Sequence, residues 1–237
     1  MRVNYIDNID CLEGLRTISD GSVDLVVTDP PYKISTRGAG MYSRPELQYT
    51  KDLEFMANGF SEEVLDELCR VLKKINIYLF CSQAQIQPLL EYFVTHHKCN
   101  WNLLTWHKSN PVPACGNKYL TDTEYILFFR ERGVRVYGDY SSKKTYYVTP
   151  SNQADKKLYG HPTIKPLEIV QNLIRNSSEP GQIVLDPFMG SGTTAVAAAS
   201  LGRDFIGFEL DEKHHATAEA RAAEELARRE EDDSWML

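Results

Sequence analysis

Short apolar runs alternate along the chain with segments of amphipathic character. The runs at 23–28, 75–81 and 182–185 are almost continuously apolar, which is typical of strands buried on both faces of a parallel sheet. Between the runs, apolar residues recur three and four positions apart, the spacing of a helix with one buried side. Strands that alternate with helices predict an α/β fold, doubly wound around a mostly parallel sheet.

The same patterns give approximate boundaries for each element. Strands are predicted at residues 3–6, 23–28, 75–81, 101–107, 124–130, 134–137, 182–185 and 204–208. Helices are predicted at residues 11–18, 61–74, 83–95, 165–175, 195–201 and 212–229. A tight turn at Arg132-Gly133 separates two of the strands, so we expect 124–130 and 134–137 to form a hairpin. Ser61 is expected to cap the second helix.

Two segments, 33–58 and 138–162, lack any hydrophobic period and are predicted to be loops. Long loops in compact domains are usually functional or disordered, so both deserve consideration as sites of contact with a partner. The 237 residues suffice for one large domain, and no internal repeat divides them. We therefore expect a single domain that spans residues 1–237.

A rigid polar stretch, Thr28-Asp29-Pro30-Pro31-Tyr32, follows the first buried strand. An acid, two prolines and an aromatic ring at the end of a strand suggest a small polar site at the carboxyl edge of the sheet, where open α/β folds bind ligands. The same residues also suit a plain proline turn in which Asp29 is the turn former. Taken alone, this stretch favours neither interpretation.

A second polar stretch joins the strand at 182–185 to an alanine-rich helix, and its sequence is Asp186-Pro187-Phe188-Met189-Gly190-Ser191-Gly192-Thr193-Thr194. A glycine turn between a strand and a helix brings backbone N–H groups against a ligand. No lysine follows Gly192, which argues against a P-loop, and Ala195 occupies the third glycine position of a dinucleotide fingerprint. A nucleoside without phosphates fits better. Glu209, 23 residues after Asp186, is placed to bind both ribose hydroxyls. The alternative is a tight turn with no ligand.

Several stretches resemble, in the same order, the motifs of one enzyme family. Asp29–Tyr32 matches a catalytic DPPY motif, Asp186–Gly192 matches a cofactor motif of the FxGxG type, and His161–Pro166 matches the segment HPTxKP. Leu79–Ser82 and Trp106–Asn110 are similar to a strand end and to a loop beside the substrate base. The sequence thus resembles the β class of S-adenosylmethionine-dependent amino-methyltransferases of DNA.

The resemblance implies a Rossmann-like fold of the methyltransferase type. Its sheet would be doubly wound, mostly parallel and seven-stranded, with permuted motif order and a hairpin-type strand towards the C-terminal end. The resemblance also implies S-adenosylmethionine as cofactor, no metal, and a catalytic motif made of Asp29, Pro30, Pro31 and Tyr32. The cofactor-binding residues that it implies are Asp10, Cys11, Asp29, His161, Thr163, Lys165, Asp186, Phe188, Gly190, Ser191, Gly192, Thr193, Glu209 and Leu210.

The implied reaction is methyl transfer to the exocyclic N6 amine of an adenine flipped out of double-stranded DNA. An ionised Asp29 and the carbonyl oxygen of Pro30 can accept the two amine hydrogens and localise the nitrogen lone pair, while Tyr32 stacks on the base. In this family an aspartate at position 29 is associated with adenine. Three alternatives stay open: N4-cytosine methylation, RNA as substrate, and a non-catalytic DNA-binding or specificity subunit on the same scaffold.

The net charge of −7 argues at first against nucleic acid as a partner, but the distribution of the charge changes this conclusion. Residues 130–165 hold eight basic residues against three acids, whereas residues 209–233 hold ten acids against four bases. A basic middle is thus masked by an acidic tail, although an ordinary solvated loop would look the same. We consider 33–58 and 131–160 as candidate target-recognition elements. The candidate DNA-binding residues are Lys33, Arg37, Arg44, Lys108, Asn110, Lys143 and Lys144.

The remaining expectations concern the cell and other subunits. No apolar run approaches the roughly 18–20 residues that span a bilayer, and the first residues do not form a signal peptide. We therefore expect a cytoplasmic protein of a bacterium, an archaeon or a phage, with no membrane partner. Five cysteines without a CxxC pair fit free thiols better than disulfides or a zinc site. The resemblance leaves room for a homodimer and for a companion specificity or restriction subunit.

Overall fold

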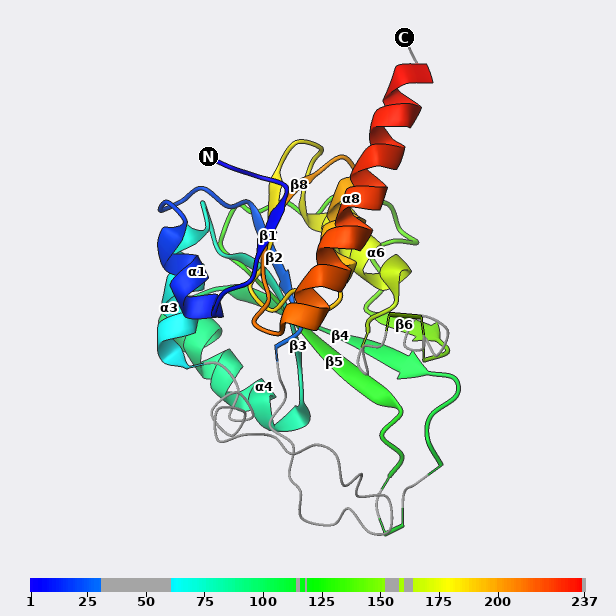
Figure 1. The fold of residues 1–237 in the computed structure, drawn as a ribbon. Helices are drawn as coiled ribbons and strands as arrows, with labels where there is room; N and C mark the ends of the chain where they lie inside the picture. Colours follow the sequence, from blue (N-terminus) through cyan, green and yellow to red (C-terminus); the bar gives the residue numbers. More distant parts are fainter. Residues whose placement is uncertain (31–60, 114–115, 118, 152–157, 160–163, 236–237) are drawn as a thin grey trace.

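The computed structural model describes residues 1–30, 61–113, 116–117, 119–151, 158–159 and 164–235, with side chains up to residue 231. Within this part of the chain, eight strands form one sheet in the order β1-β8-β7-β2-β3-β5-β4-β6 (Figure 1). The strands are β1 (Tyr5–Asp7), β2 (Leu25–Thr28), β3 (Asn76–Cys81), β4 (Asn100–Lys108), β5 (Thr123–Arg130), β6 (Tyr146–Thr149), β7 (Ile183–Asp186) and β8 (Asp204–Phe208). The helices are α1 (Cys11–Thr17), α3 (Glu62–Val71), α4 (Gln83–Leu90), the π-helix η1 (Glu91–His96), α6 (Leu167–Ser177), α7 (Thr193–Ser200) and α8 (Glu212–Trp235).

The predicted doubly wound, mostly parallel sheet is confirmed. All the pairs that the described strands form are parallel except β3–β5 and β4–β5, because β5 runs in the opposite direction between its two neighbours. The sheet has eight described strands rather than the seven expected. The additional strand is β6, which lies in a segment predicted to be a loop and pairs in parallel with the end of β4.

The predicted hairpin of 124–130 with 134–137 is wrong. Strand β5 already pairs with β3 along one side and with β4 along the other, so no edge is left for residues 134–137. The turn at Gly133, with φ of 91°, carries the chain out of the sheet instead. The N–H of Tyr137 then donates to the carbonyl of Asn176 at 2.7 Å, which directs this segment onto α6.

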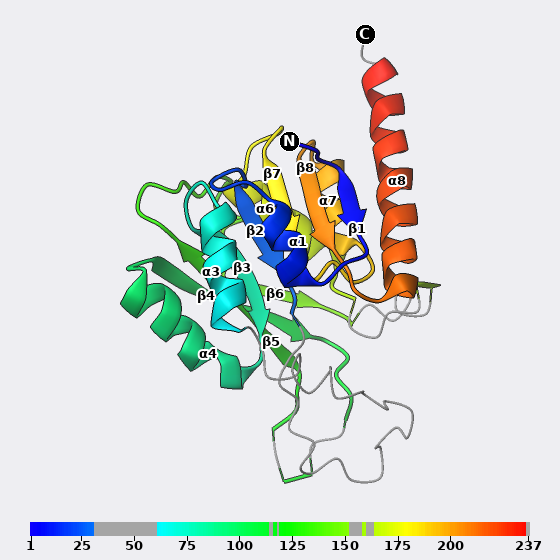
Figure 2. The same ribbon diagram turned by 60° about the vertical axis from the view of Figure 1, so that its left-hand side comes forward.

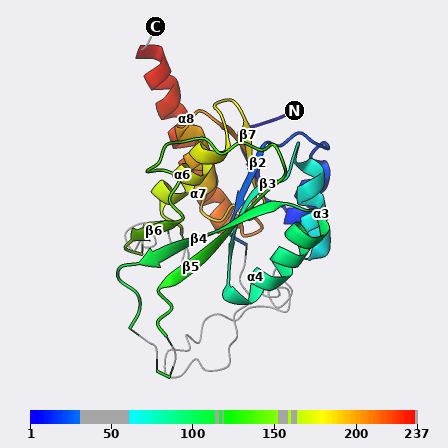
Figure 3. The same ribbon diagram turned by 180° about the vertical axis from the view of Figure 1, so that it is seen from behind.

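Helices cover both faces of the sheet (Figures 2 and 3). The core on one face joins α1, α3, α4 and η1 to strand residues such as Val26 and Ile77. The core on the other face joins α6, α7 and the first half of α8 to alternate strand residues such as Val27 and Tyr78. Burial of successive strand residues on opposite faces explains why these runs are apolar throughout. The last turns of α8 extend beyond the sheet (Figure 1).

Most helices lie close to the positions that the sequence patterns predicted. The side chain of Ser61 accepts a hydrogen bond from the N–H of Val64 and caps α3, as expected. The helix predicted at 83–95 is present but changes character, because α4, which contains Pro88, passes into the wider η1. Among the described residues, no helix combines the length and the apolar character that a bilayer crossing requires.

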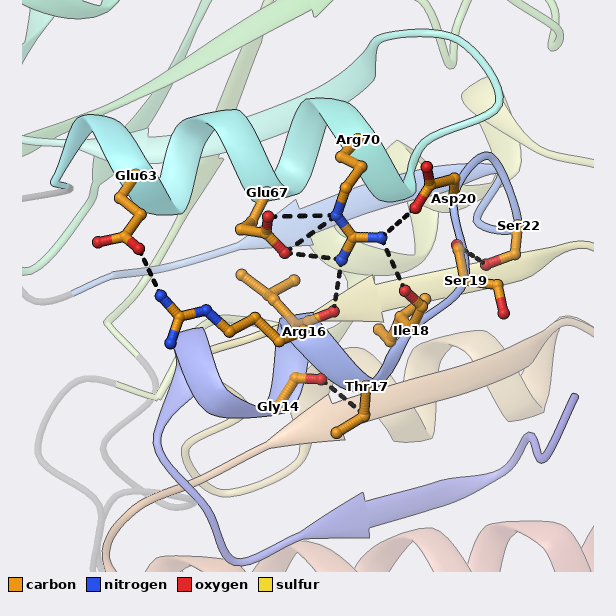
Figure 4. Close-up of polar contacts among 11 residues, drawn as sticks. Gly14, Arg16, Thr17, Ile18, Ser19, Asp20, Ser22, Glu63, Glu67 and Arg70 are labelled. Carbon is orange, nitrogen blue, oxygen red and sulfur yellow. Dashed lines mark hydrogen bonds and ion pairs between the residues drawn. The ribbon is translucent and has the colours of Figure 1, made fainter.

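An arginine joins α1 to α3 and so fixes the segment that follows β1 (Figure 4). The guanidinium of Arg70 donates to the carbonyl oxygens of Leu15 and Ile18 at the end of α1, at 2.9 Å each. Its ion pair with Glu67, at 2.6 Å, holds it in place. The carbonyl of Ile18 thus gains a charged donor beyond the end of the helix, and that of Leu15 gains one in addition to the N–H of Ile18 at 3.0 Å.

We expect Arg70→Met to lower the free energy of unfolding by about 2 kcal/mol, because two carbonyl groups at the end of α1 lose their charged donor. Urea denaturation followed by circular dichroism measures the change. Arg16→Met is the matched control, since the Arg16–Glu63 ion pair is more than half exposed on both sides and should contribute less than about 1 kcal/mol. Equal effects of the two substitutions would contradict this account.

Candidate active site

The predicted polar residues gather where β2 and β7 lie side by side at the middle of the sheet. From β7 the chain turns through α7 to β8 on one side, whereas α3 leads to β3 on the other side. The chain therefore diverges at this point, and open α/β sheets bind their ligands at such a switch point. Asp29 follows β2, Asp186 ends β7 and Glu209 follows β8, so all three lie at the same carboxyl edge.

The glycine loop forms a tight cradle between β7 and α7. Gly192 caps α7 with φ of 85°, and a Cβ atom added there would lie 2.8 Å from the Cα of Ala218 in α8. Gly190 also has a positive φ, of 56°. Backbone of this kind is accessible to glycine and strained for other residues, so both glycines are required by the shape of the loop.

Glu209 bridges the end of β8 and the glycine loop. One carboxylate oxygen accepts the N–H of Gly190 at 2.7 Å, and the other accepts the N–H of Asp211 at 2.9 Å. Each oxygen of a carboxylate can accept a further hydrogen bond, so Glu209 retains the capacity to bind hydroxyl groups of a ligand. The side chain of Asn8 donates to the carbonyls of Glu209 and Leu210, at 2.8 and 3.0 Å, and brings the start of α1 beside them.

The segment at the start of α1 contributes Asp10 and Cys11. The carboxylate of Asp10 caps the helix by accepting the N–H groups of Leu12 and Glu13, at 2.9 and 3.3 Å. Burial, with a smaller effect of Asp10, raises the pKa of the Cys11 thiol to about 12. Cys11 therefore stays protonated and acts as a small apolar group in this part of the edge.

Asp186 is almost fully buried, with 3% of its surface exposed. Its carboxylate accepts hydrogen bonds from the hydroxyls of Thr28 and Thr194, at 2.7 and 2.6 Å, and from the N–H of Phe188, at 3.1 Å. Burial raises its pKa to about 6, although these hydrogen bonds act in the opposite direction. Asp186 thus connects the end of β2, the glycine loop and α7.

Asp29 is paired with a buried lysine. The ammonium of Lys165, which precedes α6 and is 6% exposed, forms an ion pair with Asp29 and lies 3.2 Å from a carboxylate oxygen of Glu124. Glu124 in turn pairs with Lys108 at 2.7 Å. Burial lowers the pKa of Lys165, but the charges of Asp29 and Glu124 outweigh that effect and raise it above the ordinary value.

Glu124 is the residue that the sequence patterns missed. Burial raises its pKa, but the nearby charges of Lys165 and Lys108 outweigh burial and hold the pKa below its ordinary value. The available signal was a charged residue directly before the apolar run 125–129 of strand β5. In the register of the sheet, Glu124 lies opposite Trp106, next to Lys108 at the end of β4.

The structure thus brings together a large part of the predicted site. Ser191 and Thr193 belong to the cradle and are buried, and Ser191 is held by a hydrogen bond from Arg221 of α8 to its carbonyl oxygen. Pro30, next to Asp29, is also buried. The predicted residues that lie outside the described part of the chain are Pro31, Tyr32, Lys33, Arg37, Arg44, His161 and Thr163, together with the loop 33–58.

The described DNA-binding candidates lie at two different places. Lys108 and Asn110 are at the carboxyl edge, where the side chain of Asn110 accepts the N–H of Ser151 at 2.6 Å. Lys143 and Lys144 precede β6 and are exposed. They lie five or more residues from the end of that strand, about 15 Å from the edge at the usual rise per residue. Asn172 and Asn176 of α6 donate to the carbonyl of Ser142 and fix this segment to the helix.

Because its pKa of about 6 lies above the ordinary 3.8, Asp186 binds its proton more tightly in the folded chain. Its contribution to stability is therefore complete below about pH 4 and lost as the pH rises through 6, by about 2–3 kcal/mol. Asp186→Asn cannot ionise, so the stability of the wild type relative to this variant should fall across that interval. Urea unfolding at several pH values measures it. Parallel profiles would contradict the assignment, and Asp20→Asn, on the surface, is the control.

Several known proteins are similar to this chain in sequence or in fold. The Type II methyltransferase M.HinfI of Haemophilus influenzae is 28% identical over 249 residues, which cover 94% of this chain and 69% of that protein. The structure of the complex of M1.HpyAVI with SAM matches with a TM-score of 0.67 and 24% identity, over 91% of this chain and 98% of that one.

A further match is the PvuII DNA methyltransferase, described as cytosine-N4-specific, with a TM-score of 0.69 and 17% identity over 94% of this chain and 91% of that one. These structural matches show that the fold is shared. Residues 23–220, most of the chain, match the model of the DNA methylase family of the N6/N4 type. The family predicted from the sequence motifs is therefore confirmed, and the chain belongs to the N6/N4 DNA methylases.

Proposed function

We propose that this protein is a site-specific DNA methyltransferase that transfers a methyl group from S-adenosylmethionine to the N6 amine of a flipped adenine in double-stranded DNA. The observation that carries the proposal is the placement of Asp29 beside the glycine cradle at one sheet edge, with Asp186 hydrogen-bonded to both sides. Such an enzyme would act in the cytoplasm, in contact with the DNA.

The residues of the cradle fit S-adenosylmethionine. Gly190 and Gly192 give the loop its shape through their positive φ, and the carboxylate of Glu209 suits a pair of ribose hydroxyls. Leu210 follows Glu209, and Asn8 joins both to the segment that contains Asp10. Asp10 and Leu210 would adjoin the adenine of the cofactor, whereas Lys165 and Phe188 would lie towards the methionine part. The cofactor supplies a methyl group activated by a positively charged sulfur.

The protein's own contribution to the reaction is to hold and polarise the amine. An exocyclic amine is a poor nucleophile because its lone pair is delocalised into the ring. The carboxylate of Asp29 and the carbonyl of Pro30 would accept one N–H each, which localises the lone pair and stabilises positive charge on nitrogen. The nitrogen gains the methyl group and loses a proton along the bond to Asp29. The electron pair of the broken carbon–sulfur bond stays on sulfur.

We propose adenine as the target base because residue 29 is an aspartate. In the family that the sequence resembles, an aspartate at this position is associated with adenine as substrate. The fold does not discriminate, since the cytosine-N4-specific PvuII enzyme has a similar one. N4-cytosine methylation is therefore the alternative. Target recognition would fall to the segments 33–58 and 131–160, and their small size makes a second copy of the chain or a companion specificity subunit useful.

The proposal is tested by expressing the protein in a bacterial host that lacks DNA methylation and sequencing the genome for modified bases. We expect N6-methyladenine within one short recognition sequence. N4-methylcytosine would support the alternative. An unmodified genome, together with salt-sensitive DNA binding by the purified protein, would indicate a non-catalytic subunit and contradict the proposal.

Asp29→Asn should lower turnover at least about a hundredfold, because a transition-state contact with a charged acceptor is lost. Binding of S-adenosylmethionine, measured by calorimetry, should change little. Transfer of labelled methyl groups to DNA gives the turnover. Asp204→Asn, at the opposite edge of the sheet, is the matched control. Turnover of Asp29→Asn equal to that of the wild type would rule out the proposed role of Asp29.

Reversal of charge at Lys143 and Lys144 should weaken DNA binding and lower the slope of log affinity against log salt by about two, if each lysine contacts one phosphate. The same reversal at Lys73 and Lys74, an exposed adjacent pair between α3 and β3, is the control. Fluorescence anisotropy at several salt concentrations measures both. An unchanged slope would return the segment before β6 to the role of an ordinary surface loop.

A further inference from the structure

Four charged side chains form a continuous row beside the candidate active site: Asp29, Lys165, Glu124 and Lys108. Acids and lysines alternate along this charge row, with 3.2 Å between Lys165 and Glu124 and 2.7 Å between Glu124 and Lys108. None of the four side chains is more than 22% exposed. Their formal charges cancel, which suits a partly buried position.

The charge row is assembled from separate parts of the fold. Asp29 follows β2, Lys165 precedes α6, Glu124 lies in β5, and Lys108 ends β4. Aromatic rings flank the two lysines, since the Phe80 ring centre lies 5.2 Å from the ammonium of Lys165. The Trp106 ring centre lies 5.3 Å from that of Lys108. Apolar surroundings weaken screening by water, so each charge in the row affects its neighbours strongly.

We propose that Glu124 is a positioning residue for Asp29: it attracts Lys165 and offsets its charge, so that the ionised Asp29 keeps a negative potential towards the substrate amine. This inference rests on the proposed function, because Glu124 would set how strongly Asp29 accepts a hydrogen bond from the substrate amine. Without Glu124, less of the charge of Lys165 would be offset, and its attraction for the electrons of the Asp29 carboxylate would be stronger. The carboxylate would then be a weaker acceptor for an amine that becomes positive in the transition state.

Within the described part of the chain, several titratable groups near Asp29 are consistent with this role. Lys165 faces it directly, and Glu124 and Lys108 follow along the row. From the neighbouring strands, Asp186 of β7 and Cys81 of β3 respond to its charge. Burial, with a smaller effect of Asp29, raises the pKa of Asp186 to about 6 and that of the Cys81 thiol to about 12.

Glu124→Gln removes the charge of Glu124 and keeps its size. At saturating DNA and cofactor, we expect kcat to fall about tenfold while the cofactor Kd stays unchanged, and the acidic limb of the pH profile to move to lower pH. Adding Lys108→Met to this variant removes the excess positive charge and should restore part of kcat. Glu224→Gln, exposed on α8, is the matched control. Unchanged kcat, or a loss that Lys108→Met does not restore, would overturn the proposal.

A second measurement does not depend on turnover. The carboxyl carbon of Asp29, labelled with ¹³C and assigned with Asp29→Asn, is titrated by NMR in the wild type and in Glu124→Gln. The midpoint should fall by about half a unit to one unit in Glu124→Gln, because a neighbouring negative charge is removed. A midpoint that does not move would overturn the inference. If the Asp29 midpoint falls in Glu124→Gln as expected but the wild type transfers no methyl group to DNA, the result contradicts the proposed function and not the effect of Glu124 on Asp29.

Discussion

One buried carboxylate, that of Asp186, keeps the two halves of the candidate site in register. It binds the hydroxyl of Thr28 at the end of β2 and that of Thr194 in α7. The strand that leads into Asp29 and the helix that follows the glycine loop are therefore held by the same group. Burying an acid costs free energy, and three hydrogen-bond donors offset that cost.

The carboxyl edge is divided into two regions with different partners for their acids. On the side of β7 and β8, Glu209 and Asp186 accept hydrogen bonds from backbone N–H groups and from hydroxyls. On the side of β5 and β4, Glu124 pairs with lysines. Asp29 lies at the boundary, beside Asp186 and paired with Lys165. The first region suits a neutral nucleoside, and the second suits control of charge during a reaction.

Much of the fold could be predicted because its signals are local. Continuous apolar runs marked β2, β3 and β7, and the glycine loop was evident from its composition. The errors came from contacts distant in sequence. Strand β6 is a short edge strand whose pairing with β4 no local pattern indicates. The expected hairpin failed because β3 and β4 occupy both sides of β5. Glu124 was missed since Lys108 becomes its neighbour only through the register of β4 and β5, and Lys165 reaches it from the distant segment before α6.

The reversed direction of β5 determines at which edge of the sheet the connection between β4 and β5 lies. A parallel strand offers only its last residues to the carboxyl edge, whereas β5 offers its first residues, and β4 ends there. The connection between β4 and β5 thus leaves from and returns to the edge that carries Asp29. The cradle is built on the other side of β2, from β7, β8 and α7. Changes of length in that connection can therefore alter what a substrate meets while the nucleoside-binding half keeps its geometry.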